Sequence, residues 1–597
     1  MTTAQQSATY CLSPRWRAFA LERLARERFD VVVIGGGITG AGVLLEAASR
    51  GLRAALVEKH DFAAGTSSKS SRLIHGGLRY LEKLDLFLVA ESLRERNALL
   101  RAAPHLVWRA PFVIPFFQRS AFDRRRHLVR MGLFLYDAMA RLPKGMCHSR
   151  IDRDELEALA PGFAHLAPDG ALLYWDAVND DARTCLAVLR TAAARGALPL
   201  NYCEATEAME HAGGIELRLH DRISGQTLTV IARAVVNATG AWADETASRL
   251  GLGKPLPLVK ARGAHLVLSR TACTGRTCVL LPDTDNQRFV FLVPSGTSAI
   301  LGTTDIPQPE EAPPNLPMVN EVAYLASTFD RWASRPLEFE EIKGGYAGIR
   351  PLVAQGSRKH TKDISRRHVV RRSSPRSVLV TGGKFTTYQA MARATVDLLL
   401  EQVLGESRPS PRGRLHLVGA CSFRHLAQAA RAEIPAIAVS PLSARVLWRR
   451  HGLEALEVLR AHRRALEIGV VDSDQVDLRA EYGLEFVLGE AIVAFEREAA
   501  LFPADFLSRR LRLLTDDPTL AKKLLPAIAK VREYCIDSKT PGITQELDRS
   551  SAGSEASREV SVHTTELPAR LHAGFLEHKR TLASGANPGS LEKGPVG

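Results

Sequence analysis

A glycine-rich turn near the start of the chain constrains the fold more strongly than any other feature of the sequence. A continuous apolar run, residues 31–34, ends in a Gly-x-Gly-x-x-Gly motif formed by Gly35, Gly37 and Gly40, and a helix-compatible stretch, residues 43–49, follows it. Such a run is typical of a buried parallel strand. The glycines permit a tight turn and bring the backbone close to a pyrophosphate, which N–H groups at the helix N-terminus can bind. The motif therefore predicts a dinucleotide-binding unit, against the alternative of a glycine-rich turn without a ligand.

The residues after this unit indicate which dinucleotide binds. A second apolar strand, residues 53–57, ends at Glu58, where a carboxylate accepts hydrogen bonds from a ribose and favours FAD or NAD over NADP. The loop 61–71 is rich in small and hydroxyl side chains and includes Thr66, Ser67 and Ser68. It can place N–H and hydroxyl groups along a long diphosphate, which favours FAD, although its composition is also typical of an ordinary polar turn.

The length and charge of the chain limit the number of domains and the kinds of partner that we expect. With 597 residues it is too long for one hydrophobic core, so we expect two or three domains. The net charge of +14 suits an anionic substrate, an anionic membrane surface or nucleic acid. Nucleic acid is not expected as a partner, because the sequence has no base-reading motif and no zinc-ligand spacing. The eight cysteines are scattered without a Cys-x-x-Cys pair, which predicts reduced thiols in the cytoplasm and no metal site.

The sequence divides into segments of different character. Residues 1–28 are polar and contain a candidate amphipathic basic helix, which either packs on the neighbouring domain or contacts a membrane. Short strand candidates between 260 and 303 predict an antiparallel sheet beside the nucleotide-binding unit. Residues 421–535 have helical periodicity. Residues 536–597 are rich in Ser, Gly, Thr and Pro, which predicts a disordered tail.

Basic and apolar residues are mixed in a second candidate membrane segment. Residues 118–135 combine Arg124, Arg125, Arg126 and Arg130 with neighbouring leucine and phenylalanine side chains. This mixture suits a contact with anionic lipid, and a solvated basic face is at least equally compatible with it. Because no run of about 18 apolar residues is present, any membrane contact should be peripheral.

Further motifs occur in a fixed order along the chain. They are HGGLRYL at 75–81, YWD at 174–176, DDAR at 180–183, VNATG at 236–240, GTTD at 302–305, YAGIRPL at 346–352 and GGKFTTY at 382–388. In this order they closely resemble the FAD-dependent glycerol-3-phosphate dehydrogenases. The resemblance runs from about residue 29 to residue 391 and continues more weakly to about residue 514.

The resemblance implies an α/β (α+β) fold like that of D-amino-acid and glycine oxidases. A Rossmann-like FAD-binding domain over residues 29–420 would be interleaved with an antiparallel substrate domain, at about 105–175 and 246–345, and followed by a C-terminal helical cap. The implied activity is oxidation of sn-glycerol 3-phosphate to dihydroxyacetone phosphate by hydride transfer to FAD, with electrons passed to a quinone. The implied location is the cytoplasm, peripherally bound to the inner face of the membrane, and a homodimer is compatible with the resemblance.

The resemblance also assigns residues to the cofactor and the substrate. Those that match cofactor-binding positions are Gly35, Gly37, Gly40, Glu58, Thr66, Ser67, Ser68, His75, Gly76, Gly77, Gly240, Gly383 and Thr386. Those that match substrate-binding positions are Arg79, Tyr80, Arg350, Arg366 and Lys384. A phosphate dianion needs cations in fixed geometry, which agrees with the basic character of the second set.

Three residues are candidates for the catalytic step. Arg350 matches the arginine near the reacting carbon, and His265 is the first candidate for the base or for the group that orients the substrate hydroxyl. His75 is the second candidate base. The segment that contains His265 departs from the family pattern, because Arg262 replaces a lysine and Ala264 replaces a hydroxyl residue.

Two other functions remain open at the level of sequence. One is a glycerol-3-phosphate oxidase, or a related amine oxidase, that uses oxygen. The other is a flavin-binding module without turnover. The presence of Arg79, Arg350 and Lys384 argues against the second, because a module without a substrate has no need of them.

Overall fold

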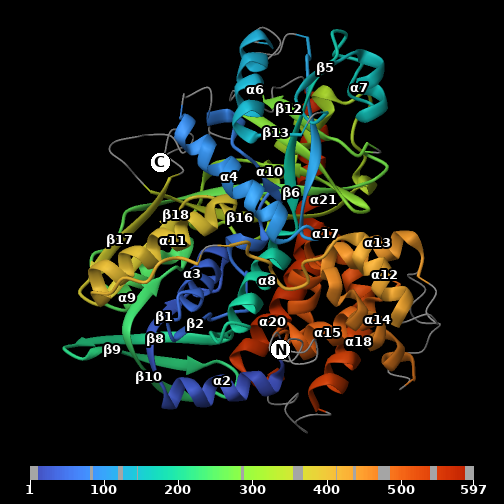
Figure 1. Ribbon diagram of the computed structural model, residues 1–597. Coiled ribbons are helices and arrows are strands. Elements are labelled where there is room, and N and C mark those ends of the chain that lie inside the picture. The colour runs from blue at the N-terminus through green and yellow to red at the C-terminus, as the bar shows by residue number, and fades with distance from the viewer. Residues whose placement is uncertain are drawn as a thin grey trace.

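The computed structural model in Figure 1 describes residues 11–80, 85–118, 126–143, 145–273, 275–283, 288–353, 367–411, 413–433, 439–467, 485–537 and 547–584. These residues form an eight-stranded sheet, a ten-stranded sheet and a set of helices that covers both. The chain passes from the first sheet to the second and back twice, so the α/β fold with interleaved domains is confirmed.

The eight-stranded sheet is built around the glycine-rich turn. Its path runs β17 (His368–Ser374), β18 (Ser377–Gly382), β10 (Thr227–Asn237), β1 (Arg28–Ile34), β2 (Ala54–Val57) and β7 (Leu198–Leu200), and β8 (Cys203–His211) and β9 (Gly214–Asp221) extend it from β10. The central strands β10, β1, β2 and β7 are parallel. Every residue of β1 after Arg28 is buried, as expected for a parallel strand that is covered on both faces.

Helix α3 (Ile38–Ser49) connects β1 to β2 and packs against α8 (Asp181–Ala193) and α11 (Tyr388–Leu398). Gly35 has a φ of +110°, a conformation that L side chains rarely adopt, and a Cβ on Gly40 would overlap the carbonyl oxygen of Gly35. The predicted strand–turn–helix–strand unit is therefore present.

The ten-stranded sheet forms the second layer. Its strands run β15 (Ile306–Pro307), β11 (Leu258–Ser269), β14 (Ser298–Gly302), β13 (Arg288–Ser295), β12 (Cys278–Asp283), β4 (Val107–Pro115), β6 (Ala171–Asn179) and β3 (Leu73–Ile74), with β16 (Ile342–Val353) paired to β11 and β5 (Ser149–Ile151) to β6. Its neighbours are antiparallel except for β4 with β12. Helix α10 (Val319–Trp332) packs on it through a buried face.

Helices α4 and α6 lie beside this sheet, and α2 lies beneath the other (Figure 1). Helix α4 (Leu86–Ala102) ends just before Pro104. Helix α6 (Arg126–Ala140) contains the end of the basic and apolar segment, whereas Arg124 and Arg125 lie outside the described residues. Helix α2 (Pro14–Arg26) buries Ala20 and Leu24 against the eight-stranded sheet.

The C-terminal part is helical. It contains α12 (Phe423–Glu433), α13 (Pro441–His451), α14 (Ala455–Glu467), α15 (Val487–Arg497), the π-helix η10 (Phe506–Arg510), α17 (Leu513–Asp516) and α18 (Pro518–Asp537). No helix in the described ranges is both long and apolar enough to cross a bilayer.

The predicted disorder of residues 536–597 is wrong for its described part. Residues 547–584 form α20 (Ser551–Ser561), the π-helix η11 (Val562–Glu566) and α21 (Leu567–Ala583). Leu567, Leu571 and Phe575 fall on one stripe of α21 and are buried against the second sheet and α10. The polar composition led to the wrong prediction of disorder, because a helix that packs along one narrow stripe needs few apolar residues.

Candidate active site

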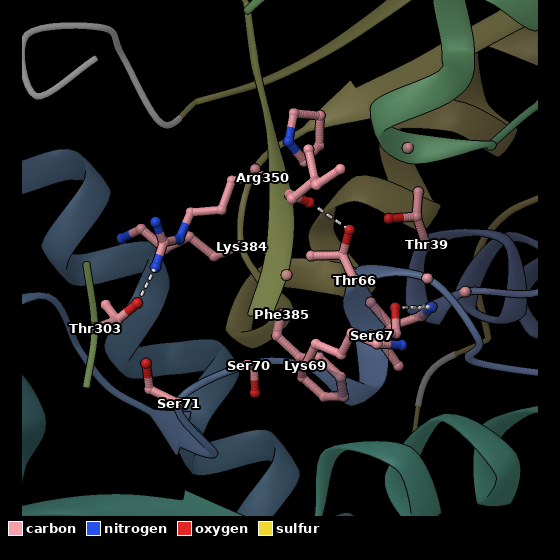
Figure 2. Close-up of a pocket in the computed structure, with 18 of the residues that line it drawn as sticks. Thr39, Thr66, Ser67, Lys69, Ser70, Ser71, Thr303, Arg350, Lys384 and Phe385 are labelled. Atoms are coloured by element: carbon pink, nitrogen blue, oxygen red, sulfur yellow. Dashed lines mark hydrogen bonds between the residues drawn. The ribbon is translucent and has the colours of Figure 1, made fainter. Parts of the chain in front are cut away.

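A cavity of about 1890 Å³ runs between the two sheets, and Figure 2 shows part of its lining. One end is bounded by Glu58 and the start of α3, and the other by Arg350 and Lys384. Its volume exceeds that of a typical small-ligand pocket, which suits an elongated ligand together with a small one.

The start of α3 supplies anion-binding groups to this cavity. Gly37 is the N-cap and has no side chain to cap the helix, so N–H groups of the first turn other than that of Ile38 can bind phosphate. The Ile38 N–H donates to Ser67 Oγ over 2.9 Å, and Thr39 and Ser67 both line the cavity in Figure 2. This donor set fits the diphosphate of a dinucleotide.

Glu58 is fixed at the end of β2. Its Oε2 accepts a hydrogen bond from the Gly36 N–H over 2.7 Å, and its Oε1 accepts one from the His60 N–H over 2.9 Å. The carboxylate lines the cavity, at the position where a dinucleotide places a ribose. The backbone thus holds Glu58 in the predicted place before any ligand binds.

The hydroxyl-rich loop runs along the cavity floor. Thr66 Oγ1 donates to the carbonyl of Ile349 over 2.5 Å and so ties the loop to the second sheet (Figure 2). Lys69 also lines the cavity, where its Nζ donates to the Ala64 carbonyl over 2.6 Å. Burial lowers the pKa of Lys69 to about 8.

The predicted cofactor residues divide into two groups. Those that line the cavity are Gly35, Gly37, Glu58, Thr66, Ser67, His75, Gly240, Gly383 and Thr386. Those outside the lining are Gly40, Ser68, Gly76 and Gly77. Gly76 serves packing, because its N–H donates to Tyr136 Oη over 3.0 Å and a Cβ there would collide with Leu93.

Two of the predicted substrate-binding cations lie at the opposite end of the cavity. Arg350 Nη2 donates to Thr303 Oγ1 over 2.8 Å, and Arg350 Nη1 lies 3.5 Å from Asp305 Oδ1. Lys384 Nζ donates to Ser92 Oγ over 3.2 Å and lies 3.9 Å from the centre of the Tyr80 ring. The structure therefore brings together three predicted substrate residues. Arg366 and the Arg79 side chain lie outside the described part of the chain.

His265 is buried behind this end of the cavity, with an exposed fraction of 1%. Its Nε2 is 2.8 Å from Ser71 Oγ, and its ring stacks on Tyr346 with a centroid distance of 4.7 Å. Ser71 lines the cavity, whereas His265 does not. Burial, followed by the charges of Arg350 and two further arginines, holds the pKa of His265 well below its usual value.

The sequence reasoning missed several residues of the lining. Ser71 lies in the hydroxyl-rich loop, and Thr303 and Asp305 belong to the GTTD motif, but nothing local assigned them a role. Arg288 lines the same end and its Nη1 donates to the Asp305 carbonyl over 3.1 Å. Glu555 and Glu559, from the segment predicted to be disordered, line the other end, and no local signal marks them.

The two departures from the family pattern lie away from the lining. Arg262 is fully buried, pairs with Glu321 over 2.8 Å and donates to the Pro313 carbonyl over 2.6 Å. The Ala264 N–H donates to Thr304 Oγ1 over 2.8 Å, and its methyl group is buried. Both residues therefore support strand β11 and do not touch a ligand in the cavity.

Comparison with known proteins shows which family the chain matches. Residues 30–398 match the FAD dependent oxidoreductase family. The chain is 32% identical to a glycerol-3-phosphate dehydrogenase of Mycobacterium leprae over 571 residues, covering 95% of this chain and 94% of that one. It is 35% identical to glycerol-3-phosphate dehydrogenase 1 of Mycobacterium tuberculosis, covering 81% of this chain and 91% of that one. The solved glycerol-3-phosphate dehydrogenase of Bacillus halodurans, complexed with FAD, superposes with a TM-score of 0.71 at 24% identity, covering 92% of this chain and 98% of that one.

Proposed function

The chain belongs to the FAD-dependent glycerol-3-phosphate dehydrogenases, and we propose that it oxidises sn-glycerol 3-phosphate to dihydroxyacetone phosphate and passes the electrons to a quinone. One observation carries the proposal. A cavity with a dinucleotide-binding turn at one end is lined at the other by cations that include Arg350 and Lys384. This arrangement suits an anionic substrate at the far end of a long cofactor.

The residues of the cavity fit FAD. The start of α3, where a glycine is the N-cap, suits the diphosphate, and Glu58 suits the adenosine ribose. The open space over Gly240 leaves room for close approach of a ligand. FAD, when bound, would supply the acceptor for one hydride, which carries the two electrons of the oxidation. The protein supplies binding groups, orientation and exclusion of water.

Lys384 and Tyr80 are proposed to hold the substrate phosphate, together with Arg79 and Arg366. An ammonium group that already lies against an aromatic ring can pair with a phosphate dianion without a large rearrangement. Arg350 is proposed to orient the carbon end of the substrate, because Thr303 and Asp305 fix its guanidinium at the cavity wall.

The proton of the substrate hydroxyl needs an acceptor. We assign this role first to His265, which acts through the Ser71 hydroxyl that separates it from the cavity. Its low pKa keeps the imidazole neutral, which is the form that accepts a proton, at neutral pH. His75, which lines the cavity directly, is the alternative acceptor.

A rim of exposed apolar side chains supports a quinone acceptor and a peripheral membrane contact. The apolar rim consists of Leu86, Leu128, Met131, Phe134 and Leu135, from α4 and α6, and all five residues also line the cavity. Phe134 is 71% exposed. An apolar rim at the mouth of the flavin cavity suits an acceptor that is dissolved in lipid, and Arg126 and Arg130 nearby suit anionic headgroups.

The acceptor is tested by supplying glycerol 3-phosphate and following two reactions in parallel. Reduction of a short-chain quinone analogue should be much faster than consumption of oxygen. Oxygen consumption with peroxide formation at an equal or higher rate would support the oxidase alternative instead. Failure of both reactions, with FAD bound, would contradict the proposed activity.

A further inference from the structure

The C-terminal segment, residues 547–584, forms one wall of the cofactor cavity. Its helix α20 contributes Glu555 and Glu559 to the lining, and Glu566 at the end of η11 extends the same wall. This wall comes from outside the residues that match the FAD-dependent oxidoreductase family, which end at 398. A part of the chain remote in sequence therefore encloses the dinucleotide site.

Helix α20 covers the end of the cavity where the adenosine half of a dinucleotide belongs. Glu555 Oε1 pairs with Arg222 Nη2 over 2.5 Å, and Glu555 Oε2 lies 3.1 Å from His60 Nδ1. His60 follows Glu58, the ribose position, by two residues. The contact joins α20 directly to the rim of the ribose site.

A second attachment joins α20 to the loop that follows Glu58. Glu559 Oε1 accepts hydrogen bonds from Arg509 Nη1 and Ser508 Oγ, each over 2.7 Å. Arg509 Nε in turn donates to Asp61 Oδ2 over 2.5 Å. Displacement of α20 would therefore disturb a buried ion-pair network that also holds the cofactor loop.

The far end of the segment is anchored on the other layer of the molecule. In α21, His578 Nδ1 lies 2.7 Å from Ser327 Oγ and His578 Nε2 lies 2.8 Å from Asp330 Oδ2, both in α10. Gly574 lets α21 approach α10 closely, because a Cβ there would lie 2.5 Å from Val322 Cβ. The segment thus spans from the substrate layer to the adenosine end of the cavity, as the red helices in Figure 1 show.

We propose that the C-terminal segment is part of the FAD-binding site and acts as a strap that retains the cofactor. Helix α20 adds two carboxylates, two alanines and one arginine, Arg558, to the lining. The carboxylates and alanines do not pair with a diphosphate. Its contribution is closure of the cavity, so release of FAD requires α20 to move away from His60 and Arg222. The inference depends on FAD as the cofactor and is independent of the proposed substrate.

The strap is tested by the rate at which FAD leaves the holoenzyme, followed by the fluorescence of the released flavin. The variant Gly574→Ala pushes α21 away from α10 at a site that does not line the cavity, and should release FAD about fivefold faster or more. The control Gly213→Ala, where an added Cβ meets only His211 at 3.5 Å, should release FAD at the parent rate.

A milder pair of variants keeps the test decisive if Gly574→Ala does not fold. Glu555→Gln removes one half-exposed ion pair and should accelerate release about two- to fivefold. The control Glu207→Gln removes an exposed pair with Arg218 that does not line the cavity, and it should release FAD at the parent rate. Hydrogen exchange should also be faster in residues 551–561 after FAD is removed. Unchanged release from Glu555→Gln, with exchange in α20 that does not respond to FAD, would overturn the proposal.

Discussion

The three glycines of the turn meet three separate steric demands. Gly35 adopts a positive φ, and a Cβ added to it would lie 2.8 Å from the Ala238 carbonyl oxygen. Gly40 leaves space for the Gly35 carbonyl, and an added Cβ on Gly37 would lie 3.1 Å from Ser67 Oγ at the cavity wall. These demands come from the local backbone, which is why the sequence predicts this part of the site well.

Gly37→Val should therefore yield colourless protein. The branched side chain would occupy the space at the start of α3 that a diphosphate needs, and would press on Ser67. Flavin content per chain, measured by absorbance, checks this. The control Gly213→Val alters a hairpin turn with room for a side chain and should keep its flavin. Full flavin occupancy in Gly37→Val would mean that the turn does not bind the diphosphate.

Lys384→Ala should lower kcat/KM for glycerol 3-phosphate by about one to two orders of magnitude. The expected loss follows from one charge-assisted contact, which contributes roughly 1.5–3 kcal/mol. The slow reaction of glycerol, which has no phosphate, should hardly change. Lys260→Ala, which removes a half-buried lysine that pairs with the exposed Glu245, is the matched control. An equal decrease in kcat/KM for glycerol 3-phosphate and for glycerol would indicate structural damage and not a lost phosphate contact.

His265 shows where prediction from the sequence reaches its limit. The motif around it predicted a catalytic histidine, but the sequence contains no sign that Ser71, from a loop far away in the chain, separates it from the cavity. Nor does it reveal that Arg350, Arg72 and Arg512 surround the imidazole. Burial and neighbouring charge depend on the packed fold, so the residue type alone cannot supply them.

His265→Ala should slow flavin reduction more than it weakens substrate binding, because a proton acceptor acts mainly in the transition state. Rapid mixing at saturating substrate over a range of pH gives the limiting rate. Ser71→Ala should reproduce part of the defect if the proton passes through the hydroxyl. A limiting rate and pH profile identical to those of the parent would shift the role to His75.

Single elements were predictable where periodicity or turn chemistry is strong. Strands β1 and β2 and the helix α3 between them follow from local pattern. Helices α20 and α21 did not, because their stability comes from packing against α10 and from ion pairs with Arg222 and Arg509. Polar composition predicts disorder only when a segment has no such partner surface.

The part of the apolar rim that lies on α6 should mediate membrane attachment. Replacing Met131 and Phe134, which are 65% and 71% exposed, by serine should reduce flotation with anionic vesicles and slow quinone reduction in membranes. Flavin reduction by substrate should stay at the parent level. Met209→Ser, which alters an equally exposed apolar residue on β8, is the control. Unchanged flotation of the double variant would place any membrane contact elsewhere.

At the scale of the whole molecule, buried ion pairs join the C-terminal helices to the FAD-binding domain. Arg183 Nη2 pairs with Glu498 Oε1 over 2.7 Å, and Arg190 Nη1 pairs with Glu454 Oε2 over 2.6 Å. Arginine neighbours outweigh burial and hold the pKa of both Glu490 and Glu498 at about 2. Such pairs connect residues hundreds of positions apart, and one sequence gives no way to match them.

Buried histidines should make the folded protein sensitive to mild acid. Burial lowers the pKa of His105 to about 3 and also lowers that of His265 and His563 from 6.5. The unfolded chain therefore binds more protons than the folded protein below about pH 6.5, and His105 alone costs about 1.4 kcal/mol of stability per pH unit below that value. Glu490 and Glu498 lose their contribution only as pH falls below about 4.5. Tm should fall steadily from about pH 6.5 to 5, and a constant Tm over that range would contradict neutral buried histidines.

The central claim is that one cavity holds FAD and brings the phosphate of glycerol 3-phosphate to Lys384 and its carbon end to Arg350. An anaerobic titration of the holoenzyme tests it most directly, with the visible absorbance of the oxidised flavin as the signal. Glycerol 3-phosphate should bleach the flavin at about one equivalent per FAD, and glycerol at the same concentration should leave it oxidised over the same time. A flavin that stays oxidised with excess glycerol 3-phosphate, or that glycerol bleaches equally fast, would contradict the account.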